Sequence, residues 1–166
     1  MVYTDVALST SAPLHRATPL QAMGRFVRCA FRLRGRASRS EYWWWMLANV
    51  VVLAAAQIAL PVLVTGETPQ PRIFLGPFGS WLYAELPLIN WPPGAVPSHP
   101  LASFGLIFAA LWMIATLVPG VTVAVRRLHD SNLSGWWVLL AVFPLGGPVV
   151  LLLALRASRS QGARFD

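Results

Sequence analysis

The stretch RRLHD at residues 126–130 lies between two long apolar runs and decides how this chain folds. Residues 101–125 precede it and residues 136–155 follow it, and neither run holds a charged side chain. About 20 apolar residues are enough for a helix to cross the ~30 Å hydrocarbon layer of a bilayer. The charged stretch is therefore predicted to lie at a membrane surface, between two transmembrane helices.

The overall composition favours a lipid environment over a soluble fold. Of the 166 residues, 56% are hydrophobic and 11% are charged, whereas roughly 25% of the residues of soluble proteins are charged. The net charge is +7, and every basic residue apart from histidine is an arginine. These arginines cluster at the ends of apolar runs, as topology signals and anionic-lipid contacts do. They do not form a soluble basic face, so no nucleic-acid partner is predicted.

The N-terminal region is predicted to hold a disordered tail and then an amphipathic helix. Residues 1–18 are rich in Ser, Thr, Ala and Pro and have no hydrophobic period, which is typical of disorder. Residues 20–33 follow a helical pattern, and Gly35 is expected to end it. The polar face of this helix holds Gln21, Arg25, Arg28 and Arg32. The opposite, apolar face holds Leu20, Met23, Val27, Ala30 and Phe31.

This amphipathic helix is too short to cross a bilayer. We expect it to lie in the headgroup plane with its apolar face in lipid. The alternative is that it packs on another protein surface.

Residues 19–166 are predicted to form a single membrane domain, which is an all-α bundle. A capping box at Ser38 and Glu41 should start its first long helix, and the tryptophans that follow fit an interfacial aromatic belt. Two polar residues inside that helix, Asn49 and Gln57, are expected to face other helices. Three transmembrane helices are predicted, over residues 42–64, 101–125 and 136–155.

The connector between the first two spans, residues 65–100, is dense in proline, which prevents a regular spanning helix. It is also rich in aromatic side chains. We therefore expect a partly ordered cap on the outer face, with one short interfacial helix near residues 79–86.

The arginine distribution orients the chain. Six arginines lie in residues 25–39 and two at 126–127, whereas the connector has only Arg72. The positive-inside rule therefore puts the N-terminus and the 126–135 junction in the cytoplasm. Three full spans would then place the C-terminal arginines outside, against the rule. A third run that is re-entrant at residues 144–148 would remove this conflict, since each half would reach only ~15 Å; three spans remain the main prediction.

Two motifs resemble a known family. Residues 35–43 read GRASRSEYW, and the RRLHD stretch is followed by SGWW at residues 134–137 and by a proline in the next helix. Together they resemble the DUF805 family of small bacterial inner-membrane proteins of unknown function, over residues 23–166. The resemblance implies a multi-pass protein of the bacterial cytoplasmic (inner) membrane. It implies no catalytic residue, cofactor or substrate, and the long connector departs from the shorter family loop.

Both motifs should lie at one cytoplasmic surface. There we expect Asp130 or Glu41 to accept bidentate bonds from an arginine of the other motif, and the surplus arginines to meet lipid phosphate. This favours a non-enzymatic protein that associates with anionic lipid or with a membrane protein partner, and a homo-oligomer stays open. The residues of this predicted structural and lipid-contact cluster are Arg36, Arg39, Glu41, Arg126, Arg127, His129 and Asp130.

Two other function classes remain as alternatives. A small transporter or channel subunit would need a water-filled cavity that reaches Asn49 or Gln57. A membrane-embedded hydrolase would need His129 to face Glu41 or a serine nucleophile such as Ser131 or Ser134. No cofactor is predicted. No metal site is predicted either, because the candidate ligands lack the usual spacing: Cys29, His15, His99 and His129.

Overall fold

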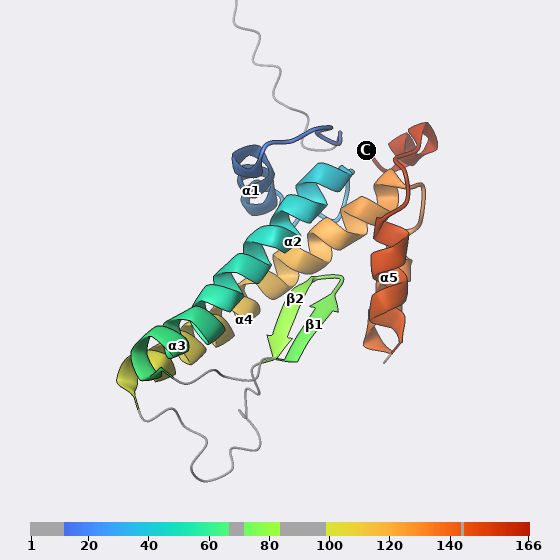
Figure 1. The fold of residues 1–166 in the computed structure, drawn as a ribbon. Coiled ribbons are helices and arrows are strands. Elements are labelled where there is room, and N and C mark those ends of the chain that lie inside the picture. The colour runs from blue at the N-terminus through green and yellow to red at the C-terminus, as the bar shows by residue number, and fades with distance from the viewer. Residues whose placement is uncertain (1–11, 67–71, 84–98, 144) are drawn as a thin grey trace, which may run out of the picture.

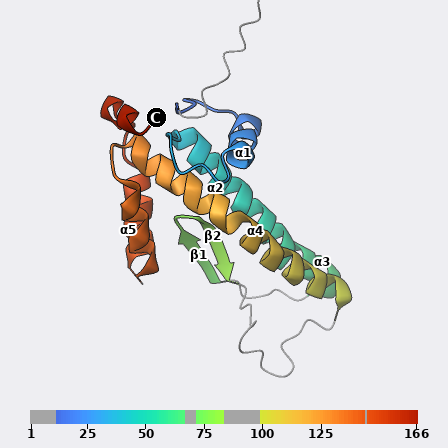
Figure 2. The same cartoon turned by 180° about the vertical axis from the view of Figure 1, so that it is seen from behind.

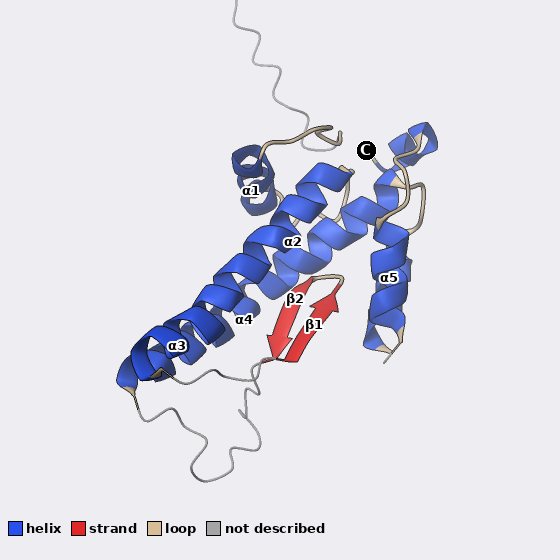
Figure 3. Ribbon diagram, viewed as in Figure 1, coloured by secondary structure: helices blue, strands red, loops and turns tan. Residues whose placement is uncertain are grey.

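Two long antiparallel helices form the centre of the molecule (Figures 1 and 3). The computed structural model describes residues 12–66, 72–83, 99–143 and 145–166. The first long helix is continuous over 27 residues, Arg39–Thr65. It consists of three segments, α2 (Arg39–Ala54), the π-helical turn η1 (Ala55–Ala59) and α3 (Leu60–Thr65).

The second long helix is α4 (Pro100–Asp130), which has 31 residues. Within the described residues, Arg39–Thr65 and Pro100–Asp130 are the two helices long and apolar enough to cross a membrane. They lie side by side in both views (Figures 1 and 2). Their positions agree with the spans expected over residues 42–64 and 101–125.

Both polar side chains inside the first long helix are buried, as expected. Asn49 Oδ1 accepts a hydrogen bond from Trp112 Nε1 of α4 at 2.8 Å, and Gln57 is 1% exposed. The two helices also approach closely, because a Cβ on Gly105 would lie 2.5 Å from the Ala56 carbonyl oxygen. An amide bonded across the interface avoids the free energy that an unpaired polar group would cost in hydrocarbon.

The third apolar run is not a single helix, so the predicted span over residues 136–155 is wrong. It consists of a 3₁₀ helix, η2 (Gly135–Val142), and a separate helix, α5 (Gly146–Ala154). Phe143 has extended backbone angles, which end η2. Gly146 then lies against the Leu140 carbonyl with no room for a Cβ. The two segments therefore pack on each other as a helical hairpin.

Both ends of this helical hairpin lie at the last turns of α4. Gly135 faces Val125 and His129 there, and the Ala154 carbonyl accepts a hydrogen bond from Arg127 Nε at 2.9 Å. The chain leaves the end of α4 and returns to it, which matches the re-entrant alternative.

The connector contains an antiparallel β-hairpin, β1 (Arg72–Gly76) and β2 (Gly79–Tyr83). The interfacial helix expected near residues 79–86 is therefore wrong over 79–83, and the rest of it lies outside the described residues, as does most of the connector. Gly79 has φ = 137°, a backbone conformation that favours glycine and permits the tight turn.

The tip of this β-hairpin lies beside the long helices rather than over either of their ends (Figure 1). The Tyr42 hydroxyl donates a hydrogen bond to the Pro77 carbonyl at 2.7 Å, near the start of α2. The Phe78 carbonyl packs directly on Gly120 of α4. A cap on the outer face is thus the wrong description of residues 72–83, because the tip of the hairpin packs on the sides of both long helices.

Gly120→Ala should displace the hairpin tip and destabilise the protein. An added methyl group would overlap the Phe78 carbonyl, which is backbone and cannot swing aside as a side chain could. Overpacking of this kind costs about 1–3 kcal/mol. Thermal unfolding of the detergent-solubilised protein measures the loss. Gly24→Ala is the matched control, because nothing lies within 4 Å of its Cβ position; equal stability of the two variants would contradict the packing.

The amphipathic helix is shorter than expected. It is α1 (Pro19–Arg28), which begins with a capping box between Thr18 and Gln21 and ends at Cys29. Gly35 lies further along, in the loop before α2, with φ = 92°. The predicted extension to residue 33 and the predicted role of Gly35 as the end of this helix are therefore wrong.

Residues 12–18 are ordered against the start of α2, so the predicted disorder is wrong for them; residues 1–11 lie outside the described residues. The Leu14 carbonyl accepts a hydrogen bond from Ser38 Oγ at 2.6 Å. The Ala17 carbonyl accepts one from Trp44 Nε1 at 2.9 Å. The N-cap side chain of α2 and one side chain within α2 thus hold a segment whose composition alone resembles a disordered tail.

Candidate functional site

The residues of the two motifs meet at one end of the long helices. The Ala37 amide donates to the Arg126 carbonyl at 3.0 Å, and Arg126 Nη2 donates to the Arg36 carbonyl at 2.9 Å. His129 Nδ1 lies 3.2 Å from the Gly35 carbonyl. The loop before α2 and the last turns of α4 therefore lie side by side. We call the seven predicted residues of this region the arginine collar: Arg36, Arg39, Glu41, Arg126, Arg127, His129 and Asp130.

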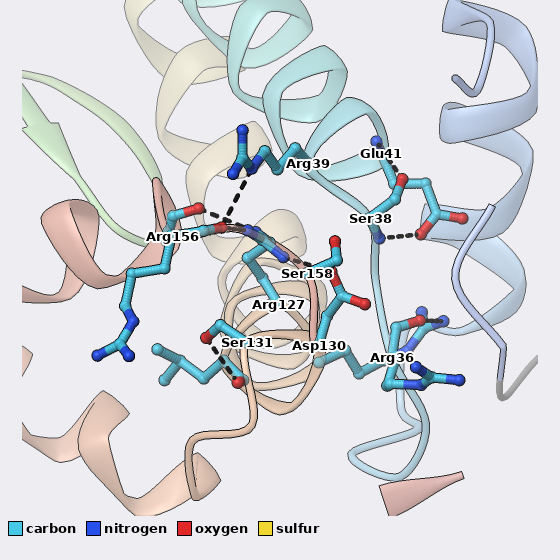
Figure 4. Close-up of polar contacts among 12 residues, drawn as sticks. Arg36, Ser38, Arg39, Glu41, Arg127, Asp130, Ser131, Arg156 and Ser158 are labelled. Carbon is cyan, nitrogen blue, oxygen red and sulfur yellow. Dashed lines mark hydrogen bonds and ion pairs between the residues drawn. The ribbon is translucent and has the colours of Figure 1, made fainter. Parts of the chain in front are cut away.

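A buried ion pair forms the centre of the arginine collar (Figure 4). Arg127 Nη1 and Asp130 Oδ2 are 2.5 Å apart, and both side chains are 0% exposed. Both members come from α4, so the predicted carboxylate clasp between the two motifs is wrong about the partner of Asp130. The i,i+3 spacing on one helix makes this pairing possible without any contact to the other motif.

The end of α5 and the chain after it supply further partners of this ion pair, although Asp130 Oδ1 is buried without a hydrogen-bond partner among the described residues. Arg127 donates to the carbonyls of Ala154 and Arg156, and Asp130 accepts from Ser158 Oγ. Arg39 Nε reaches the same Arg156 carbonyl at 3.1 Å. The two motifs are thus linked through backbone carbonyls rather than through a shared carboxylate.

Glu41 pairs with Arg25, which was expected on the polar face of the amphipathic helix and not among the partners of the two motifs. Its Oε1 lies 2.6 Å from Arg25 Nε of α1, and its Oε2 accepts from the Ser38 amide at 2.9 Å, as the predicted capping box requires. Arg25 is buried, so it does not lie on the exposed side of α1. This ion pair anchors α1 on α2, and no sequence spacing indicated it, because the two residues lie in different helices.

The C-terminal segment, including the 3₁₀ helix η3 (Ser160–Phe165), packs on the arginine collar. Arg36 donates two hydrogen bonds to the Asp166 carboxylate, at 2.8 and 2.5 Å. The hydrogen bond to Asp166 is the main reason why the pKa of Arg36 is raised. The Phe165 ring stacks on His129 with ring centroids 4.1 Å apart. Sequence reasoning missed these contacts, because they join residues that lie far apart in the sequence.

The comparisons with known proteins agree with the motifs. A family model described as "Protein of unknown function (DUF805)" matches residues 30–166. The chain belongs to the DUF805 family.

Relatives of this DUF805 protein are named membrane proteins. The chain is 29% identical over 129 residues to inner membrane protein YhaI of Escherichia coli (strain K12), covering 78% of this chain and 77% of YhaI. It is 24% identical over 120 residues to inner membrane protein YhaH of the same strain, covering 72% of this chain and 71% of YhaH. No solved structure matches. The molecular function of the family is unknown.

The serines proposed as nucleophiles for the hydrolase alternative bond to the backbone around them. Ser131 Oγ donates to the Leu128 carbonyl at 2.9 Å, and Ser134 Oγ accepts from the Trp136 amide. His129 instead meets Gly35 and Phe165. A hydrolase needs a nucleophile and a base within hydrogen-bond reach of each other, and these contacts do not provide that pair. Across the described ranges, no group of three or more His, Cys, Asp or Glu residues could hold a metal ion.

Most arginines whose burial the structure describes are either buried or exposed, and Arg36 is intermediate. Arg25, Arg126 and Arg127 are buried, so they cannot reach lipid phosphate. The predicted lipid contact by Arg126 and Arg127 is therefore wrong, because both are used inside the protein. The exposed arginines within the described residues are Arg16, Arg28, Arg32, Arg34, Arg39, Arg156, Arg159 and Arg164.

Proposed function

We propose that this chain is a non-enzymatic, multi-pass protein of the bacterial inner membrane that associates with anionic lipid through its arginine-rich cytoplasmic surface. The observation that carries the proposal is the outer face of α1 and of the loop after it. Leu20, Val27 and Phe31 are 87%, 71% and 83% exposed, and the arginines Arg28 and Arg34 next to them are exposed as well. Apolar and basic side chains together are what a helix in the headgroup layer presents to lipid.

The position of α1 supports this assignment. The ion pair between Arg25 and Glu41 holds it against the first turn of α2, where a transmembrane helix would enter the bilayer. On its inner side, the Phe26 ring stacks on Trp45 with centroids 3.7 Å apart. Part of the polar face of α1 thus packs on α2 through Arg25. The apolar residues of α1 that face outward are left to contact lipid.

The helical hairpin of η2 and α5 supports a cytoplasmic location for the remaining arginines. Its outward side chains are large and apolar, for example Trp136, Val142 and Leu152, so it suits the hydrocarbon of one leaflet. Because both its ends lie at the end of α4, the chain after it returns to the arginine collar. Arg156, Arg159 and Arg164 then share a side with the other arginines, in agreement with the positive-inside rule.

Changing exposed arginines should weaken the preference for anionic lipid. Each basic residue near the surface contributes ~1 kcal/mol to the attraction, so Arg28→Gln combined with Arg34→Gln should lower the preference for phosphatidylglycerol over phosphatidylcholine by about thirtyfold. Native mass spectrometry of the purified protein with both lipids measures the ratio of bound species.

Arg28→Lys with Arg34→Lys is the matched control, because it keeps both charges and should keep most of the preference. Equal retention of the two lipids by the wild-type protein would refute the proposed function. If the preference depends on an additional copurifying protein, the exposed surface serves a protein partner instead.

A further inference from the structure

A groove lies where α2, α4 and the tip of the β-hairpin meet. Its volume is about 150 Å³, and its walls come from Asn49, Phe78, Gly79, Met113 and Thr116, together with Ile114 and Leu117. A water molecule needs only about 10–15 Å³ of such space, and an apolar cavity of similar size in another protein holds a benzene molecule. The groove is therefore large enough to hold a benzene-sized part of a larger apolar molecule.

The groove lies near the middle of the bilayer in the proposed topology. Asn49 comes ten residues after Arg39, which is ~15 Å along a helix and half of the hydrocarbon thickness. Thr116 comes ten residues before Arg126 in α4, which gives the same depth. Two helices that run in opposite directions thus give the same position independently.

The polar groups of the groove are already bonded. Asn49 Oδ1 accepts from Trp112 Nε1 at 2.8 Å, and Thr116 Oγ1 donates to the Trp112 carbonyl at 2.7 Å. A buried water usually needs two to four polar partners, and the remaining lining side chains are apolar. A hydrated ion or polar solute is therefore a poor occupant, which also argues against the transporter alternative at this place.

The mouth of the groove faces lipid. Ile114 is 68% exposed and Leu117 is 42% exposed. Leu111 and Val118, which lie three residues before and four residues after Ile114, are exposed too, and residues at this spacing share one face of a helix. The face of α4 that borders the groove is continuous with the apolar surface that a transmembrane helix turns to the bilayer.

We propose that this groove binds the acyl chain of a membrane phospholipid, with the end of the chain packed against Phe78 and the Asn49–Trp112 pair. The depth is that of chain ends, the lining is apolar and the opening is lateral. Because the groove contacts no headgroup, it should accept a chain whatever the charge of the lipid. This separates it from the interaction of exposed arginines with anionic headgroups, although both rest on a membrane-spanning orientation.

Photo-crosslinking in vesicles tests this proposal. The protein is reconstituted into phosphatidylcholine that carries a diazirine at the end of one acyl chain, and crosslinked peptides are mapped by mass spectrometry. We expect adducts concentrated on residues 113–117 and 78–79. Thr116→Phe, which fills the groove, should lower those adducts at least fivefold, whereas Leu111→Phe on the neighbouring exposed surface should not.

Thermal unfolding of both variants checks that they are folded. If Thr116→Phe does not fold, Leu117→Trp provides a second way to block the groove. Adducts spread evenly over the exposed apolar face of α4, or unchanged by both blocking variants, would overturn the proposal. Adducts that survive Arg28→Gln with Arg34→Gln, together with a missing preference for phosphatidylglycerol, would leave the groove established and the headgroup interaction refuted.

Discussion

Asp130→Asn should lower the free energy of unfolding by about 3–5 kcal/mol, because it leaves the Arg127 guanidinium charged and buried without its partner. Both side chains are 0% exposed, so solvent cannot replace the lost carboxylate. The substitution also weakens the bond to Ser158 Oγ, which holds the chain after α5. Thermal unfolding in detergent and the yield of folded protein in the membrane measure the effect.

A double variant separates the loss of one charge from the loss of the ion pair. Replacing both members, with Arg127→Met and Asp130→Leu, removes the unpaired charge and should cost less than the sum of the two single changes. The carbonyls of Ala154 and Arg156 still lose their donor, so we expect only partial recovery. Arg159→Gln, an exposed arginine in the same region, is the control, and an Asp130→Asn variant as stable as this control would contradict the burial of the pair.

Local signals in the sequence predicted the parts of the fold that depend on local physics. The two long spans follow from uninterrupted hydropathy, and the capping box at Ser38 and Glu41 follows from the spacing of two residues. The location of the motif residues at one end of α2 and α4 followed from the arginine distribution. Each of these depends on interactions that are short in sequence or set by the bilayer.

The partners of the buried charges depend on contacts that are long in sequence. Helical periodicity placed Arg25 on a polar face, but it could not show that this face packs on α2 and meets Glu41. Composition suggested disorder for residues 12–18, yet a hydroxyl donor at the N-cap of α2 and an indole donor within α2 bind two of their carbonyls. The density of proline in the connector excluded a spanning helix without indicating a β-hairpin.

Hydropathy alone could not decide the third apolar run. Twenty apolar residues that cross a bilayer and twenty that turn back within one leaflet have the same composition. The difference lies in Gly146, which permits backbone contact with Leu140, and in the arginines that follow the run. The violation of the positive-inside rule, together with the proline and glycine residues at 144–148, was therefore the sequence signal that pointed to the helical hairpin.

Residue 161 should be labelled from the cytoplasmic side of the membrane only. Cys29 is the single cysteine, so Cys29→Ser provides a background without thiols, and Gln161→Cys introduces an exposed one. If residues 135–154 return to the arginine collar, a membrane-impermeant maleimide added to intact spheroplasts should leave Gln161→Cys unlabelled. Labelling should become complete once the membrane is opened. A third full span would give the opposite, all-or-none result.

Two reference positions make this experiment decisive. Arg34→Cys, in the loop before α2, should behave as Gln161→Cys does, because Arg36 and Asp166 form an ion pair at 2.5 Å and so bring the two segments to one surface. Glu67→Cys, in the connector, should be labelled in intact spheroplasts. Protection of Arg34→Cys together with labelling of Gln161→Cys would refute the placement of both segments on one side of the membrane. In that case the segments that carry the ion pairs of the arginine collar would lie on opposite sides of the membrane, and Asp166 could not reach Arg36.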